Sequence, residues 1–179
     1  LVESLLEYTR VESGRVNAHM EELDTVGIVR EVLAAHVDHA AAGVTLNFEP
    51  PAPELPVFVG DARLLRVVLS NLVSNALKFT SAGSVTVRLD SETEWHVFEV
   101  RDTGIGMEDA DLKRIFLPFE QLAPLQRKSI PGVGLGLALV EQIVRALGGA
   151  IAVSSRQGHG SVFSVRLPSS PSSTALQPT

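Results

Sequence analysis

Two asparagines and a lysine recur along one segment of the chain, NLVSNALKFT. Asn71, Asn75 and Lys78 stand at positions i, i+4 and i+7, so a helix would place all three on one stripe. An amide oxygen suits a hard cation such as Mg²⁺, and a lysine ammonium can neutralise phosphate. The alternative is that one asparagine is solvated while the other bonds the backbone. This segment alone leaves both readings open.

An aspartate ends the strand-like run WHVFEVRD and is followed at once by glycines, in DTGIGM. Because side chains alternate along a strand, Asp102 should share a face with the apolar Phe98 and Val100. A buried carboxylate needs a hydrogen-bond donor, and the exocyclic amine of adenine is one. Gly104 and Gly106 would then let the backbone approach the base without Cβ atoms. Taken alone, the same aspartate could simply cap a turn.

A second glycine-rich stretch, GVGLGLALV, opens an apolar helix. N–H groups at a helix start bind phosphate, and the helix dipole adds to the attraction. The Lys-Ser or Lys-Thr of a Walker A loop is missing, and so is the long βαβ unit of a dinucleotide fingerprint. The stretch therefore predicts phosphate binding of another kind, or only a loop before a packed helix. Its candidate residues are Gly132, Gly134, Leu135 and Gly136.

A long segment without regular pattern, residues 103–133, leads to these glycines, and such segments in compact domains are usually functional. Arg127 and Lys128 within it could close as a lid over the terminal phosphate of a nucleotide, or could be ordinary surface charge. Phe116 and Phe119 could anchor this lid through apolar contacts, although packing alone would also explain them.

Composition limits the classes of function. The chain has 179 residues, 45% of them hydrophobic, which suits one globular domain with a core. A net charge of −6 gives no basic footprint for nucleic acid, and the absence of cysteine excludes disulfides. No apolar run is long enough to span a membrane, and the histidines have no metal-ligand spacing. Leu1 lies within a helical pattern, so we expect the chain to be part of a longer protein.

Periodicity predicts an α+β fold. We expect a two-layer α/β sandwich, in which a mostly antiparallel sheet is covered on one face by helices. Helical spacing covers residues 1–19, 24–43, 61–78 and 135–147. Strand-like alternation covers residues 44–49, 85–90, 94–102, 150–155 and 160–167.

The chain divides into three expected parts. Residues 1–19 carry one apolar stripe that needs a partner helix. Residues 20–168 form the globular domain. Residues 169–179 are poor in bulky apolar side chains, which predicts a disordered tail or linker.

Taken in order, NLVSNALKFT, VRDTGIGM, IFLPFEQ and GVGLGLALV resemble the asparagine box, first glycine box, phenylalanine box and second glycine box of sensor histidine kinases. The resemblance to their catalytic ATP-binding domain spans roughly residues 24–167. It implies the Bergerat fold, which gyrase, MutL and heat-shock chaperones share. It also implies cytoplasmic phosphorylation of a histidine, for relay to an aspartate of a response regulator or of a fused receiver domain.

The resemblance also implies roles for single residues. Asn75 would coordinate Mg²⁺ with Asn71 nearby, and Lys78 would lie near the phosphates of ATP. Asp102 would bind the adenine amine. The lid would be anchored at the phosphates by the second set of glycines, Gly132, Gly134 and Gly136.

The N-terminal LLEYTRVESGRV is similar to the end of the second helix of the family's dimerisation and phospho-acceptor domain. The helix that carries the acceptor histidine is absent from the sequence, so we expect homodimerisation through missing helices and no autophosphorylation by this chain alone. Val133 replaces a frequent hydroxyl residue, and the segment LAPLQRKSIPG contains two prolines. These departures bear on nucleotide affinity and lid order rather than on the fold.

Two other functions stay open at this point. One is a nucleotide-binding regulatory module without kinase activity, which Val133 and the unusual lid would suit. The other is a hydrolytic ATPase of the same superfamily. In hydrolytic relatives a glutamate four residues before the magnesium asparagine activates water, and here that position is Asn71. An amide is no general base, so transfer to a protein acceptor is favoured over hydrolysis.

Overall fold

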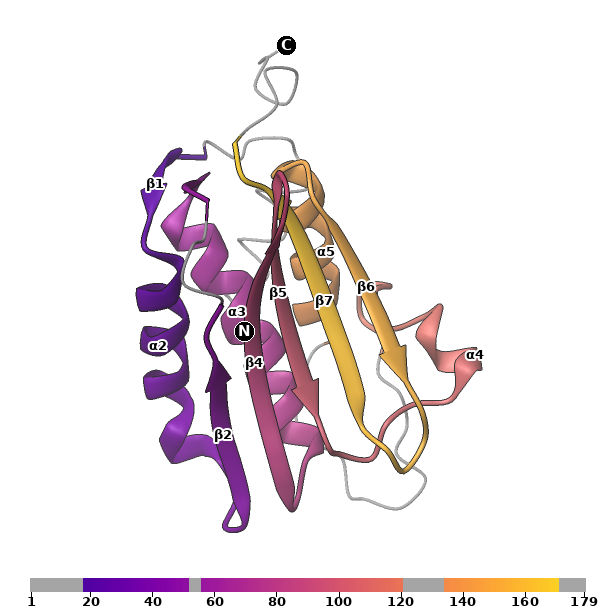
Figure 1. Ribbon diagram of the computed structural model, residues 1–179. Helices are drawn as coiled ribbons and strands as arrows, with labels where there is room; N and C mark the ends of the chain where they lie inside the picture. The colour runs from indigo at the N-terminus through magenta and orange to yellow at the C-terminus, as the bar shows by residue number, and fades with distance from the viewer. Residues whose placement is uncertain (1–17, 52–55, 121–133, 171–179) are drawn as a thin grey trace.

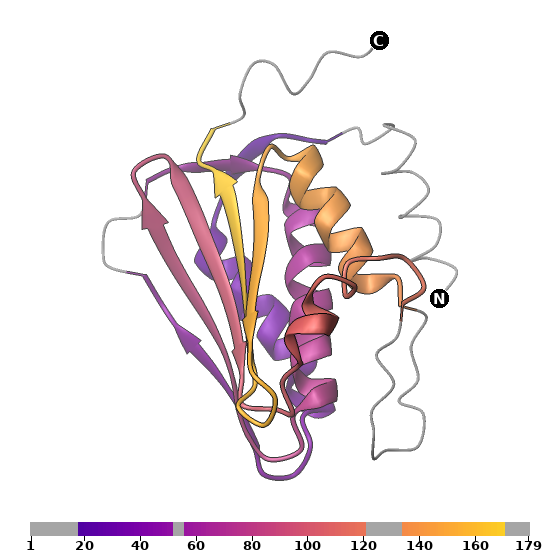
Figure 2. The same cartoon turned by 90° about the vertical axis from the view of Figure 1, so that its right-hand side faces the viewer.

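The computed structural model describes residues 18–51, 56–120 and 134–170. A five-stranded sheet forms one layer, and the second layer consists of helices packed on one face of that sheet (Figures 1 and 2). The covering helices are α2 (Thr25–His36), α3 (Ala62–Phe79) and α5 (Gly136–Ala146). The expected α+β two-layer sandwich is therefore confirmed. Most of the helix expected at residues 1–19 lies outside the described residues.

The sheet has the strand order β2-β4-β5-β7-β6. One edge strand, β2 (Val44–Glu49), pairs in parallel with β4 (Gly83–Glu92). All the other pairings are antiparallel and join β4, β5 (Trp95–Asp102), β7 (Ser161–Pro168) and β6 (Ala150–Ser155). The expectation of a mostly antiparallel sheet is thus correct, and the connection from β2 to β4 runs through α3.

A second, two-stranded sheet was not expected from the sequence. It consists of β1 (Glu21–Leu23) paired antiparallel with β3 (Phe58–Gly60). Strands of three residues are too short to show alternation, so the pattern gave no signal for them. A backbone hydrogen bond from Val59 N to Ser169 O, 2.8 Å long, ties β3 to the chain just beyond β7.

Aspartates begin the two long helices, as the sequence predicts. The side chain of Asp61 accepts a hydrogen bond from Leu64 N, and that of Asp24 accepts one from Gly27 N. The helix after Asp24 ends earlier than expected, because a short 3₁₀ turn, Val37–His39, follows α2. The expected extent to Gly43 is therefore wrong. No helix among the described residues is long and apolar enough to cross a membrane.

The core lies between the sheet and the helices and uses every second residue of the central strands. Phe98 and Val100 of β5 are fully buried on the face that also carries Asp102. The short helix α4 (Asp109–Leu112) lies in the segment expected to be irregular. The buried residues of α3 include Leu65, Leu69, Leu72 and Ala76, the face predicted to be apolar.

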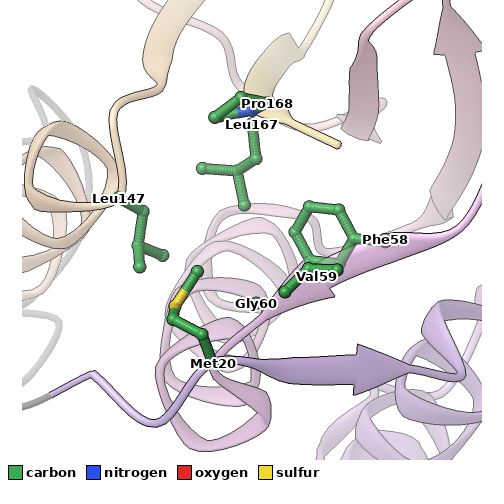
Figure 3. A pocket seen from close by; sticks show the side chains of 7 residues that line it. All are labelled: Met20, Phe58, Val59, Gly60, Leu147, Leu167 and Pro168. Carbon is green, nitrogen blue, oxygen red and sulfur yellow. The ribbon is translucent and has the colours of Figure 1, made fainter. Parts of the chain in front are cut away.

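The far end of β5 is closed by aromatic packing. His96 is fully buried, 4.8 Å from the Phe58 ring by centroid, and its Nδ1 lies 3.1 Å from Ser169 Oγ. A cavity of about 10 Å³ lies on the other side of this packing, lined by Met20, Phe58 and Leu167 among others (Figure 3). That volume is about what one water molecule needs. This end of the sheet is packed, and the polar candidates lie at the other end.

Candidate functional site

The structure places the three polar candidates of the first motif on one helix, α3, in its second half. Asn71, Asn75 and Lys78 are all half-buried. Asn71 Nδ2 donates a 2.8 Å hydrogen bond to Val67 O, one turn back. Because this bond uses the amide N–H of the side chain, it fixes the amide and leaves Oδ1 as the atom that can accept or coordinate. The alternative in which an asparagine only bonds the backbone therefore explains the Nδ2 of Asn71 but not its Oδ1.

The first residue of α5 lies directly against these amides. A Cβ atom on Gly136 would come 2.7 Å from Asn71 Oδ1 and 3.9 Å from Asn75 Nδ2. A larger residue at this position would have to displace the Asn71 amide or move α5. The N-cap residue of α5 is Leu135, which is buried. Its apolar side chain cannot accept a hydrogen bond, so it does not cap the first-turn N–H groups of α5. The side-chain amides of Asn71 and Asn75 and the first turn of α5 thus lie at one place.

Lys78 lies in the last turn of α3. Burial lowers the pKa of its ammonium group, because desolvation disfavours the charged form. Its Nζ lies 5.3 Å from the ring centroid of Phe79. A partly desolvated ammonium group would gain from pairing with a phosphate oxygen, because the phosphate supplies a counter-charge.

Asp102 ends β5 with a side chain only 5% exposed. Its Oδ1 accepts a 2.8 Å hydrogen bond from Gly104 N. Burial raises the pKa of this carboxyl, while hydrogen bonds from Gly104 N and from the amide and hydroxyl of Ser161 partly oppose the rise. Desolvation is the larger effect. An ionised carboxylate has about four acceptor sites, so a ligand could add a further donor to those of Gly104 and Ser161.

The glycines after Asp102 make room for the protein's own backbone. A Cβ on Gly104 would meet Phe79 O at 2.4 Å, and Ile105 N donates to the same carbonyl at 3.3 Å. Gly106 has a φ of 61° and a Cβ there would meet Arg156 O at 2.0 Å. The loop is thus held between the end of α3 and the turn that joins β6 to β7. The predicted approach of this backbone to a base stays a prediction.

Three hydroxyl residues of this region were missed by sequence reasoning. Ser161 faces Asp102 across the β5–β7 ladder, and Ser155 Oγ lies 3.0 Å from Ser161 Oγ. Thr80 is 2% exposed, and its Oγ1 has no hydrogen-bond partner in the part of the chain that the structure describes. A buried hydroxyl in that state calls for a ligand or a water molecule. The alternation of β7, which puts Ser161 on the face of Phe163, was the available signal.

The structure places only part of the second glycine stretch. Phe119 N donates to Gly134 O at 2.9 Å, so the phenylalanine segment reaches the start of α5. Phe116 is half-buried against the core, whereas Phe119 is 63% exposed with a φ of 64°. The remaining candidates Arg127, Lys128 and Gly132 lie outside the described residues, as does Val133.

The donor set fits a magnesium ion held mainly by water and phosphate. The described residues contain no group of three or more His, Asp or Glu that could hold a metal. What the site offers is the Asn71 oxygen, the Asn75 amide and the cradle at Gly136. Mg²⁺ is commonly bound through few protein oxygens together with substrate phosphates, which is the arrangement these amides allow.

Comparison with known proteins gives the class that this fold and site define. Residues 60–171, more than half of the chain, match the family described as histidine kinase-, DNA gyrase B- and HSP90-like ATPase. The chain belongs to this family. Within it, the chain is a catalytic ATP-binding domain of the sensor histidine kinase type, as the relatives below show. The resemblance found in the sequence is thereby confirmed.

Its curated relatives include sensor histidine kinases. The chain is 31% identical over 171 residues to the sensor histidine kinase RcsC of Escherichia coli, covering 94% of this chain and 18% of that protein. It is 36% identical over 174 residues to the non-motile and phage-resistance protein of Caulobacter vibrioides, covering 94% and 20%. The chain thus spans about a fifth of the length of these relatives.

Solved structures agree with this placement. Full-length ShkA in complex with AMPPNP matches with a TM-score of 0.84 and 30% identity, over 98% of this chain and 36% of that chain. The histidine kinase AdeS of Acinetobacter baumannii matches with a TM-score of 0.75 and 26% identity, over 94% and 76%. The two-layer architecture is therefore that of histidine kinases with known structures.

Proposed function

We propose that this chain binds ATP together with Mg²⁺ and presents the γ-phosphate to a histidine of a phospho-acceptor domain. The observation that carries the proposal is the continuity of the site. The loop after Asp102 touches Phe79 at the end of α3, and the amides of α3 touch Gly136 at the start of α5. A buried acceptor for a base and a cradle for phosphates thus lie along one helix.

Asp102 is the proposed adenine contact. Its carboxylate is buried and keeps acceptor capacity beyond the donors of Gly104 and Ser161, so the exocyclic amine of adenine would pair with it. Guanine carries a carbonyl at that position, which would face the carboxylate with a second acceptor. The site is therefore specific for adenine nucleotides. Thr80, whose buried hydroxyl has no partner among the described residues, is a further candidate to bond the base or a water beside it.

The phosphates are proposed to lie between α3 and the start of α5. Asn75 and Asn71 would hold Mg²⁺ through amide oxygens, and Lys78 would pair with a phosphate oxygen. The bound ion would neutralise charge on the phosphates. First-turn N–H groups of α5 would bind the remaining oxygens. Gly134 and Gly136 serve this role by bringing the backbone close, and Gly132, Arg127 and Lys128 stay predictions.

The site favours transfer over hydrolysis. The position expected to carry a water-activating glutamate is Asn71, whose amide N–H is bonded to Val67 O. An amide cannot take a proton from water, so hydrolysis would lack its base. Transfer needs mainly positioning and charge neutralisation, which this site can supply.

The remaining parts of the proposal concern the whole protein. Residues 1–19 are proposed to end a dimerisation helix, residues 20–168 to form the catalytic domain, and residues 169–179 to be a tail or linker. A homodimer would bring the acceptor histidine to the nucleotide. The phosphate would pass to an aspartate of a response regulator or a fused receiver domain, in the cytoplasm.

The test is phosphotransfer in a chain extended by a dimerisation and phospho-acceptor domain. With γ-labelled ATP we expect a phosphoprotein whose label survives alkali and is lost in acid, as for phosphohistidine. Asn75→Ala should abolish the label, and Ser74→Ala, on the exposed side of α3, should retain it. Steady phosphate release without a phosphoprotein would instead support a hydrolytic ATPase. Tight ATP binding with neither product would support a regulatory module.

A further inference from the structure

The hydroxyl of Ser155 sits between the loop that follows Asp102 and the β6–β7 turn. It accepts a 2.9 Å hydrogen bond from Met107 N and lies 2.8 Å from Gly160 O. It also lies 3.0 Å from the hydroxyl of Ser161. One side chain at the end of β6 thus contacts the glycine loop, the turn and the strand that faces Asp102.

The turn that joins β6 to β7 packs its backbone directly against the loop that follows Asp102. A Cβ on Gly160 would meet Asp102 O at 1.9 Å, and Gly158 N donates to Ile105 O at 2.6 Å. The turn and the loop therefore approach each other without side chains between them. Ser155 adds the side-chain hydrogen bond that joins them at Met107.

The contacts of Ser155 link the loop and the turn to the serine beside Asp102. Ser155 accepts from Met107 N and donates its one proton to Gly160 O, 2.8 Å away. Ser161 bonds the Asp102 carboxylate through its own hydroxyl. The two serine oxygens lie 3.0 Å apart, so the position of Ser155 limits where the Ser161 hydroxyl can lie.

We propose that Ser155 is a positioning residue for adenine recognition. It holds the loop Gly104–Met107 at a fixed position relative to the Asp102 carboxylate, which Ser161 contacts. The inference rests on the proposed function, because it assumes that Asp102 binds adenine. Ser155 touches no part of the nucleotide. It acts by fixing the orientation of a carboxylate oxygen and the distance between the glycine loop and β7.

The test compares the affinity of the 179-residue chain for ATP and for inosine triphosphate, which lacks the exocyclic amine. Ser155→Ala should weaken ATP binding by about five- to tenfold, the effect of losing the one hydrogen bond between Asp102 and the adenine amine. It should leave inosine triphosphate binding unchanged. Ser155→Thr retains the hydroxyl and should restore the preference for ATP. Ser154→Ala, at the exposed neighbouring position, should match the unmodified chain.

Two results would overturn the inference while the proposed function stands: Ser155→Ala keeping the full preference for ATP, or losing affinity equally for both nucleotides. An unmodified chain without any preference for ATP would overturn both. If Ser155→Ala does not fold, hydrogen exchange at the Met107 amide of the unmodified chain tests the inference instead. Saturation with ATP should slow that exchange, and an unchanged rate would contradict the proposed bridge.

Discussion

Gly136 and Asn71 lie so close together that a single methyl group on the glycine would come 2.7 Å from the amide oxygen of the asparagine. The two residues belong to different helices, α5 and α3. Their contact brings the first turn of α5 next to the side-chain amides of α3, where we propose that a phosphate and its magnesium ion bind. The proposed phosphate site therefore depends on the absence of one side chain.

Gly136→Ala should weaken magnesium-dependent ATP binding by about tenfold. The added methyl must push the Asn71 amide or α5 away, because 2.7 Å is well below an ordinary contact. Thermal stability should change little, since alanine is the better helix former. Calorimetric titration with and without Mg²⁺ checks this. Equal affinity of the two chains in the presence of Mg²⁺ would refute the role given to this contact.

Gly104→Ala should destabilise the chain by about 2 kcal/mol and remove ATP binding. Its methyl would meet Phe79 O at 2.4 Å and Asp102 Oδ1 at 2.9 Å, and the backbone carbonyl cannot move freely. Gly158→Ala is the matched control, because Gly158 has a φ of 78° and open space around it. The control should lose about 1 kcal/mol through backbone strain and keep ATP binding. Denaturant unfolding and nucleotide titration of both variants measure the contrast.

Asp102→Asn should change how stability depends on pH. Burial raises the pKa of Asp102 in the folded chain above its ordinary value of 3.8. The folded chain then holds a proton that the unfolded chain releases, so this group's contribution to stability is complete below pH 3.8 and is lost as pH rises through the folded pKa. Asparagine cannot ionise and loses nothing. As pH rises, the unfolding free energy of Asp102→Asn should therefore increase relative to that of the unmodified chain.

Unfolding of the two chains at pH 4 and pH 7.5 measures this difference. Asp102→Asn should also bind ATP more weakly at pH 7.5, since the amide offers the adenine amine a neutral acceptor. A difference in stability that stays constant between the two pH values would mean that the carboxyl is not held in a desolvated state.

Asp61→Ala should destabilise the chain more than Asp24→Ala, and neither should change adenine preference. Both aspartates cap a helix, which is worth about 1 kcal/mol. Asp61 is buried and also accepts a 2.9 Å hydrogen bond from His19 N, whereas Asp24 is exposed. The second bond should add about 1 kcal/mol to the loss. Thermal unfolding of both variants provides the comparison, and equal losses would show that the contact with His19 contributes nothing.

The sequence predicted the parts of this fold that depend on periodicity or on a single cap. α3 spans nearly its expected residues, since its apolar stripe and Asp61 act locally. Asp102 lies on the buried face because alternation along β5 fixes it. The small sheet of β1 and β3 could not be predicted, because its three-residue strands are stabilised by pairing over long sequence separation.

The site shows the same division. The types and spacing of Asn71, Asn75 and Asp102 identified them as candidates, and the structure gives their positions, whereas their chemical roles stay predictions. The contact of Gly136 with Asn71 and the bonds of Ser155 were not predictable, since both depend on how separate elements pack. The glycines after Asp102 were interpreted as space for a base, whereas the structure shows them making space for protein backbone as well.

Calorimetric titration of ATP and Mg²⁺ into this chain and into Asp102→Ala tests the central claim most directly. We expect the unmodified chain to bind ATP, more tightly with Mg²⁺ than without. Asp102→Ala should weaken binding by about ten- to a hundredfold, because a charged hydrogen-bond partner of the base is lost. Equal binding of ATP by both chains would contradict the adenine site. No binding by the folded, unmodified chain would contradict the account as a whole.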